Sequence, residues 1–222
     1  MAVRTEYETL ARDFPALAAQ FGIAVDDALE RELVGLMAAF ETVDRHVDAL
    51  ADASARLALG RAIVRALRGD VSLDGELGAR LDQLHAQLRR GGAVDRVAGG
   101  VERFFAHSEL LRTTTDARVF VQAVLDEAAR ASEMTLAVAE RVATDEFARF
   151  FARLSEVANL VDKLHDVRGD RRRGEIAVRA GTRLHARLLL AFVVRCASLL
   201  VLAPKPLTLV AWGARYLVPP RR

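Results

Sequence analysis

Proline is missing from almost the whole length of this chain, and that absence limits the fold more than any other feature. The five prolines lie near the two ends, so that none falls between residues 16 and 203. Glycine is also absent from Val101 to Arg168. An all-β fold would need turns about every ten residues, and turns commonly use these two residue types. The sequence therefore excludes an all-β fold and predicts long helices.

The composition describes a globular chain with a large core. Apolar residues make up 52% of the 222 positions and charged residues 28%, which argues against a disordered or low-complexity chain. The length suits one domain. We predict a single all-α domain over residues 1–203, built as a bundle of seven to nine helices. An apolar C-terminal tail over residues 204–222 would follow it.

Charge and cysteine content narrow the function classes. The formal net charge is +2, and basic and acidic residues alternate along most of the chain. A nucleic-acid binder normally concentrates positive charge on one face, so we expect no nucleic-acid partner. Cys196 is the single cysteine, which excludes an intramolecular disulfide and a cysteine metal cluster. The first residues contain no apolar signal region, so we expect a cytoplasmic location.

Apolar residues recur every three or four positions, as in helices that bury one face. The clearest stripe follows Asp26 and Asp27, whose carboxylates suit a helix N-terminus. It comprises Leu29, Leu33, Leu36, Met37, Phe40, Val43, Val47 and Leu50. Further helices are predicted over 56–68, over 76–90, from about 145 toward Gly169 and Gly174, and over 175–203. Helix starts are predicted near 113–116 and 144–146, and an internal loop over the glycine-rich segment 91–100.

Two carboxylates lie one turn apart at the end of the first stripe. Asp44 and Asp48 are four residues apart, which places both on one face of the helix. Like charges at this spacing destabilise an isolated helix, so the pair invites a cation. The alternative interpretation is a solvated helix face.

A denser acidic cluster lies near the end of the helix that starts at about 145. Asp162, Asp166 and Asp170 repeat every four residues, and Asn159 precedes them by one turn. Oxygen ligands in this pattern suit Mg²⁺, which is usually held jointly by carboxylates and substrate phosphates. The next three residues are Arg171, Arg172 and Arg173, and the planar donors of arginine suit phosphate oxygens. The alternative is an ordinary salt-bridged helix end.

Taken together, the two clusters predict a binding slot. At 100° per residue, the Asp44 face carries Phe40, Met37 and Leu33. The Asp162 face carries Asn159, Ala158, Ser155, Phe151 and Ala148. If these faces oppose each other, they form an apolar slot with a carboxylate-lined mouth, which suits a long hydrocarbon with a diphosphate head. For the aromatic stripe alone, plain core packing is the competing interpretation.

With these motifs the sequence resembles the class I isoprenoid synthase superfamily, nearest to its squalene/phytoene synthase branch. The segment Asp44-Arg-His-Val-Asp48 is similar to the first acidic motif of that superfamily. The segment Leu164-His-Asp166-Val-Arg-Gly-Asp170-Arg-Arg-Arg-Gly-Glu175 is similar to the second. The resemblance implies an all-α fold of that type and a Mg²⁺-dependent terpene synthase or prenyltransferase that acts on an allylic prenyl diphosphate. It also implies a homodimer as one form of assembly.

The resemblance also implies roles for individual residues. Metal binding would use carboxylates of both motifs, namely Asp44, Asp48, Asp162, Asp166 and Asp170. The diphosphate would be bound by Arg171, Arg172 and Lys163, and the hydrocarbon would lie against Phe40 and Phe151. Arg45 departs from the first motif, where a second adjacent aspartate is common. This departure favours the alternative of a non-catalytic helical protein that binds a lipid or a partner, and a helical adaptor without a small-molecule site is a third hypothesis.

Two further features have competing interpretations. Arg112 and Arg118 could reach a diphosphate from a third helix, but we favour surface positions for both. Leu188 to Ala203 is nearly all apolar, and we favour a helix packed in the core. The alternative is peripheral membrane contact through the C-terminal tail, anchored by Trp212, Arg215, Tyr216, Arg221 and Arg222.

Overall fold

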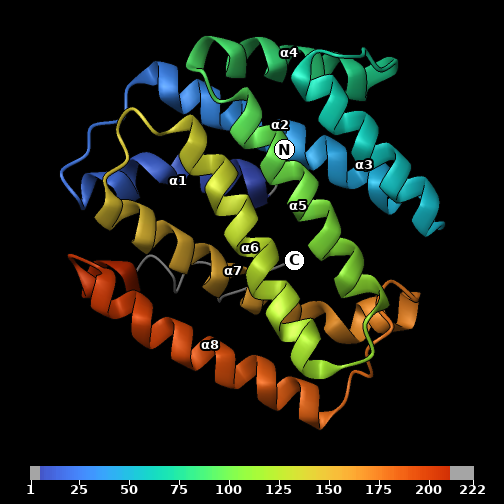
Figure 1. Ribbon diagram of the computed structural model, residues 1–222. Helices are drawn as coiled ribbons and strands as arrows, with labels where there is room; N and C mark the ends of the chain where they lie inside the picture. Colours follow the sequence, from blue (N-terminus) through green and yellow to red (C-terminus); the bar gives the residue numbers. More distant parts are fainter. Residues whose placement is uncertain (1–5, 211–222) are drawn as a thin grey trace, which may run out of the picture.

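The computed structural model describes the backbone of residues 6–210 and the side chains of residues 11–210, and this part is entirely helical (Figure 1). Its eight long helices are α1 (Glu6–Ala19), α2 (Asp27–Asp48), α3 (Ala53–Arg68), α4 (Gly75–Gly91), α5 (Val94–Thr113), α6 (Ala117–Val138), α7 (Asp145–Arg173) and α8 (Thr182–Leu202). A further helical turn begins at residue 206, and the described range contains no strand. The prediction of an all-α bundle in a single domain is confirmed.

Local capping signals fixed several helix ends where the sequence predicted them. Asp26, Asp116 and Thr144 each accept backbone N–H groups of the first turn of α2, α6 and α7. Helices α3 and α7 end at Gly69 and Gly174, with φ values of 82° and 76°. Glycine adopts this left-handed conformation without the penalty that a Cβ would bring. The predicted starts near residues 26, 116 and 144 are confirmed.

The predicted loop over residues 91–100 is wrong, because α5 begins at Val94 and runs through two of its glycines. A Cβ placed on Gly100 would lie 2.4 Å from Cγ of Met134 on α6. Gly100 therefore serves the close approach of two helices rather than a turn. The sequence shows the glycine but not the neighbouring helix that requires it.

The start predicted for the last helix is also wrong. We expected it over residues 175–203, but α8 begins at Thr182. The connecting segment buries the side chains of Ile176 and Val178. The residue between them donates its backbone N–H to the carbonyl of Arg112 at 2.9 Å. These contacts with the end of α5 hold the segment out of the helix.

Buried residues form two apolar clusters, and α7 passes through both. In the larger cluster, Phe14 of α1 contacts Phe147 and Phe151 edge-on, with ring centroids 5.2 and 5.3 Å away. In the smaller cluster, Leu160 and Val167 of α7 pack with residues of α5, α6 and α8. The acidic residues of α7 therefore lie in its second half, beside the smaller cluster.

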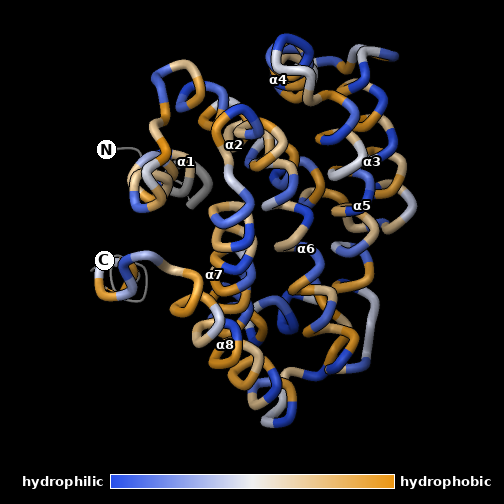
Figure 2. Tube along the Cα trace, turned by 60° about the vertical axis from the view of Figure 1, so that its left-hand side comes forward, coloured by the Kyte–Doolittle hydropathy of each residue, from blue (hydrophilic) through white to orange (hydrophobic). Residues whose placement is uncertain are grey.

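Helix α8 lies along one side of the bundle, and most of its surface is exposed (Figures 1 and 2). Only Leu184, Leu188 and Leu199 of this helix are buried. Within the described residues, α8 is the one helix long and apolar enough to cross a membrane, by length and composition alone. The prediction of a helix packed in the core is wrong for this outward face. The residues proposed as a tail anchor, 212–222, lie outside the described range.

Candidate functional site

The carboxylates of α7 form a continuous row. Because α7 continues through Gly169 to Arg173, Asp162, Asp166 and Asp170 lie on one face of the helix. The two ends of the row differ in exposure, since the side chain of Asp162 is 38% exposed and that of Asp170 only 9%. Asp166, between them, is exposed.

Lys163 ties the two ends of this row together. Its Nζ lies 3.4 Å from Asp162 and 3.8 Å from Asp170. Burial acts to lower the pKa of Lys163, but the charges of Asp162, Glu127 and Asp170 outweigh it and raise the pKa. Burial likewise raises the pKa of Asp170, and Lys163 opposes that rise. Lys163 is therefore a charged group held among carboxylates.

Arg173 is the arginine of the triplet that reaches the carboxylate row. Its Nη2 lies 2.6 Å from Asp170, and its guanidinium also binds Glu175 just beyond the helix end. The Arg173 hydrogen bond lowers the pKa of Glu175. The predicted diphosphate ligands were Arg171, Arg172 and Lys163, not Arg173.

Arg171 and Arg172 lie on a different side of α7. With Arg168 and Ala180 they line a shallow hollow of about 430 Å³. Arg171 donates to the carbonyl of Ile176 rather than toward the carboxylates. At 100° per residue, positions 168, 171 and 172 point away from Asp166, whereas position 173 shares its side. The structure thus separates these two predicted diphosphate ligands from the acidic row.

Glu127 on α6 is a member of the cluster that the sequence analysis missed. Asn159 of α7 donates to its Oε2 at 3.3 Å and to the carbonyl of Val124 at 2.8 Å. Burial raises the pKa of Glu127, against the opposing charge of Lys163. A sequence signal existed, because Glu127 interrupts a stripe of buried residues that includes Phe120 and Val124. An acid within such a stripe is unusual unless it has partners.

The end of α2 carries the second carboxylate group. Asp48 pairs with Arg112 of α5, with Nη2 and Oδ1 2.6 Å apart. The Arg112 side chain is half-buried, at 21% exposed, whereas Arg118 is exposed as expected. Asp44 lies one turn earlier on α2 and is half-buried.

Arg56, also missed, fixes the α2–α3 connection that follows Asp48. This side chain is 10% exposed and binds Glu109 of α5 through two hydrogen bonds of 2.6 and 3.0 Å. It also donates to the carbonyls of Leu50 and Ala51 at 3.0 and 2.9 Å. Hydrogen bonding to Glu109 raises the pKa of Arg56. A paired, buried arginine of this kind holds the end of α2 against α5.

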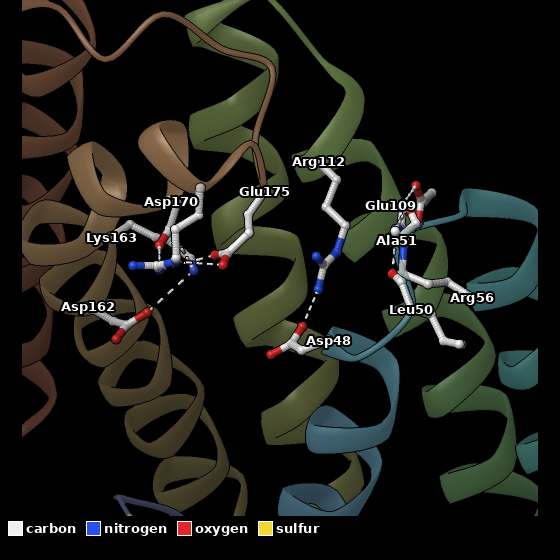
Figure 3. A network of polar contacts seen from close by, with 11 residues as sticks. Asp48, Leu50, Ala51, Arg56, Glu109, Arg112, Asp162, Lys163, Asp170 and Glu175 are labelled. Atoms are coloured by element: carbon white, nitrogen blue, oxygen red, sulfur yellow. Dashed lines mark hydrogen bonds and ion pairs between the residues drawn. The ribbon is translucent and has the colours of Figure 1, made fainter.

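Figure 3 shows these charged groups in one view as three sets, the α7 cluster, the Asp48–Arg112 pair and the Arg56–Glu109 pair, with no hydrogen bond or ion pair drawn between the sets. Arg112, which binds Asp48, also acts electrostatically on Glu127 and Glu175. Lys163 of the α7 row acts on the same two carboxylates. Such effects act through space over about 10 Å and do not require direct contact. The structure therefore brings the end of α2 and the acidic row of α7, far apart in sequence, into one polar region.

The apolar slot predicted below the carboxylates is largely filled. Leu33, Met37 and Phe151 are 0%, 3% and 1% exposed and belong to the larger core, and Phe40 packs against it half-buried. For Phe151, core packing is what the structure shows. Ala158, one turn below Asp162, is exposed, so the α7 face is open at that level. The two best-defined hollows of the described part lie elsewhere, at Arg168 to Ala180 and at Arg12 to Val34.

The network carries more negative than positive groups. Three cations, Arg112, Lys163 and Arg173, interact with six carboxylates. These are Asp48, Glu127, Asp162, Asp166, Asp170 and Glu175. No group of three or more His, Cys, Asp or Glu side chains in the described residues is arranged to hold a metal ion. Mg²⁺ commonly uses only one or two carboxylates together with water and substrate phosphates.

Comparisons with known proteins do not assign this chain to a family. Neither family models, nor curated proteins, nor solved structures show a match to this chain. The similarity of the two acidic motifs to those of class I isoprenoid synthases stays a prediction from the sequence.

Proposed function

We propose that this chain is a Mg²⁺-dependent class I isoprenoid synthase that ionises an allylic prenyl diphosphate at the carboxylate network. The observation that carries the proposal is that Arg112, which binds Asp48 of α2, and Lys163, which binds Asp162 and Asp170 of α7, both act electrostatically on Glu127 and Glu175.

The donors available suit Mg²⁺, since they are all oxygen and the outer members of the α7 row are accessible. Asp162 is partly exposed and Asp166 exposed, so an ion can reach both. Asp44 and Asp48 would bind metal from α2, and Asp162, Asp166 and Asp170 from α7. When bound, Mg²⁺ would neutralise diphosphate oxygens and act as a Lewis acid on the leaving group.

The basic residues would bind the diphosphate itself. Arg112 and Arg173 present planar guanidinium donors to the network, and Lys163 presents an ammonium. Each is now paired with a carboxylate that a metal ion would take over, which frees the cation for phosphate oxygens. In the reaction the allylic C–O bond breaks, the diphosphate leaves with the electron pair, and an allylic cation remains.

The exposed part of the α7 face would take the hydrocarbon. Ala158 and the half-buried Ser155 are small residues directly below Asp162, and Phe151 closes the face one turn further down. Phe40 of α2, half-buried, would contact the chain from the other side. The carbon skeleton of the product depends on this short apolar segment.

The direct test is Asp166→Asn, with C10, C15 and C20 allylic diphosphates supplied with and without Mg²⁺. We expect Mg²⁺-dependent diphosphate release to fall at least about 100-fold, because one metal ligand is lost. The matched control is Asp95→Asn, an exposed aspartate at the start of α5, which should keep full activity. The helical CD signal should be unchanged in both variants. Equal release by Asp166→Asn and the unaltered chain would refute the proposal.

A second candidate is a non-catalytic protein that binds the same ligand. The contact of Phe14 with Phe151 favours it, because these rings fill the base of the predicted slot. Thermal unfolding with Mg²⁺ and a prenyl diphosphate distinguishes the two, since a ligand that binds the native state raises Tm. A raised Tm without any product would favour this candidate over the enzyme.

A further inference from the structure

Helix α8 carries a continuous apolar face that no described part of the chain covers. Leu190 is 66% exposed, Val193 55% and Val201 85%. Further exposed apolar residues on this helix are Leu189, Val194 and Leu200. At 100° per residue, all of them fall on one side of the helix. From Leu189 to Val201 this face is about 18 Å long, and a patch of this kind marks an interaction site.

The opposite side of α8 is attached to the bundle. Leu184, Leu188 and Leu199 are buried, and Arg195 binds Glu156 of α7 at 3.1 Å. In this arrangement the helix lies flat on α7 and α6, with its apolar face directed outward. A helix held in this way can rest on a surface but does not cross a membrane while it stays packed.

The segment of the chain that carries this face has basic residues but no acidic ones. Residues 176–222 contain no Asp or Glu, while their basic residues are Arg179, Arg183, Arg187, Arg195, Lys205, Arg215, Arg221 and Arg222. The hollow lined by Arg168, Arg171, Arg172 and Ala180 lies at the start of α8. Asp116, at the start of α6, is the acidic group that acts on Arg187. The N-terminal end of the apolar face is therefore strongly basic.

This charge pattern selects among occupants of the face. A second copy of the chain docked through α8 would bring two basic segments together without acids to pair them, and like charges repel. An anionic lipid surface offers both an apolar interior and negative phosphates. We propose that the α8 face binds the surface of an anionic lipid bilayer, with its leucines and valines at the acyl boundary and the neighbouring arginines on headgroup phosphates. This inference is independent of the proposed function.

The test is co-flotation of the full chain with vesicles of phosphatidylcholine alone or with one third phosphatidylglycerol. We expect binding to the anionic vesicles to exceed binding to the neutral ones at least about tenfold, and to fall as salt is raised. Equal binding to both kinds of vesicle, or binding to neither, would overturn the proposal.

Paired substitutions locate the contact. Leu190→Gln with Val201→Gln should reduce binding to anionic vesicles by at least about tenfold, because two exposed apolar contacts are lost. Leu57→Gln, at an exposed leucine of α3, is the matched control and should bind as the unaltered chain does. Arg179→Gln with Arg183→Gln should weaken binding to anionic vesicles while leaving the apolar face intact.

Three results would contradict the assignment to α8. If the leucine and valine variant keeps full binding, the contact lies elsewhere in the chain. If the arginine variant keeps full binding at low salt, charge does not select the partner. If the unaltered chain is a dimer by light scattering and Leu190→Gln with Val201→Gln makes it a monomer, the face joins two copies instead.

Discussion

Helices α7 and α8 pack against each other, and each reverses the usual distribution of residue types. The second half of α7 directs Lys163 and Asp170 toward the interior, where Glu127 of α6 meets them. Helix α8 leaves Leu190 and Val201 in solvent. Buried charges and a large exposed apolar face are the two arrangements that a folded chain normally avoids. Residues placed against the local rules are expected at functional sites, so the comparison points to α7 for chemistry and to α8 for contact.

The buried charges of α7 and the exposed apolar face of α8 are stabilised by different contacts. The buried and half-buried carboxylates of α7 are compensated by cations of the same helix, Lys163 and Arg173, so that their stability depends on these pairs. The apolar face of α8 needs no compensation in solution, because a few leucines on the opposite side attach the helix. Removing one partner should therefore harm α7, whereas the outer face of α8 should tolerate change.

The largest expected effect is a difference in the free energy of unfolding between substitutions on the two sides of α8. Leu188→Ala, at a residue that is 0% exposed, should lower the free energy of unfolding by about 2–5 kcal/mol, because it leaves a cavity. Val193→Ala on the outer face should change it by less than about 0.5 kcal/mol. Urea unfolding followed by CD measures both. Similar losses for the two variants would mean that the outer face is covered in solution.

A smaller effect is expected from Lys163→Met. It leaves Asp162, Asp170 and Glu127 without their shared cation, and the free energy of unfolding should fall by about 1–3 kcal/mol. Lys205, the other lysine of the chain, is exposed, and Lys205→Met should have an effect below about 0.5 kcal/mol. If Lys163→Met is as stable as the control, the network does not stabilise the fold.

The smallest effect is a change of stability with pH. It tests whether the carboxyl group of Glu127 is buried in the folded protein. Its pKa is raised above the ordinary value of 4.5, so its contribution to stability is complete below that pH and is lost as pH rises through the folded-state pKa. Glu127→Gln cannot titrate. The variant should therefore gain stability relative to the unaltered chain as pH is raised from about 4 toward 8.

The measurement is urea unfolding of both chains across that pH range. Glu102→Gln, at an exposed glutamate, is the control and should show no such trend. A constant difference between Glu127→Gln and the unaltered chain would show that Glu127 is solvated in the folded protein.

Much of the fold could be predicted because helix signals are local. Asp26, Asp116 and Thr144 cap the helices that they were predicted to cap, and the four-residue spacing of Asp162, Asp166 and Asp170 places them on one face once α7 passes Gly169. Helix α1, however, was not predicted, and it supplies Phe14 to the core.

The site could be predicted only in part. Its acidic members were visible as spacing, and Lys163 was predicted with them, but the parts of Arg112 and Arg173 were not, because these depend on which side chains lie close in space. The sequence offered three arginines in a row, and only the turn of the helix distinguishes Arg173 from Arg171 and Arg172. Position along the chain does not tell which side of a helix meets a partner.

The sequence by itself determined that the described part of the chain is all-helical, several of its helix ends and two rows of carboxylates, since each depends on residues within one or two turns. Only the tertiary structure decided that α2 and α7 meet at one polar region, that Phe14 fills the space beside Phe151, and that α8 leaves its apolar face uncovered. These outcomes follow from packing between distant segments, where the same apolar stripe can be buried or left outside.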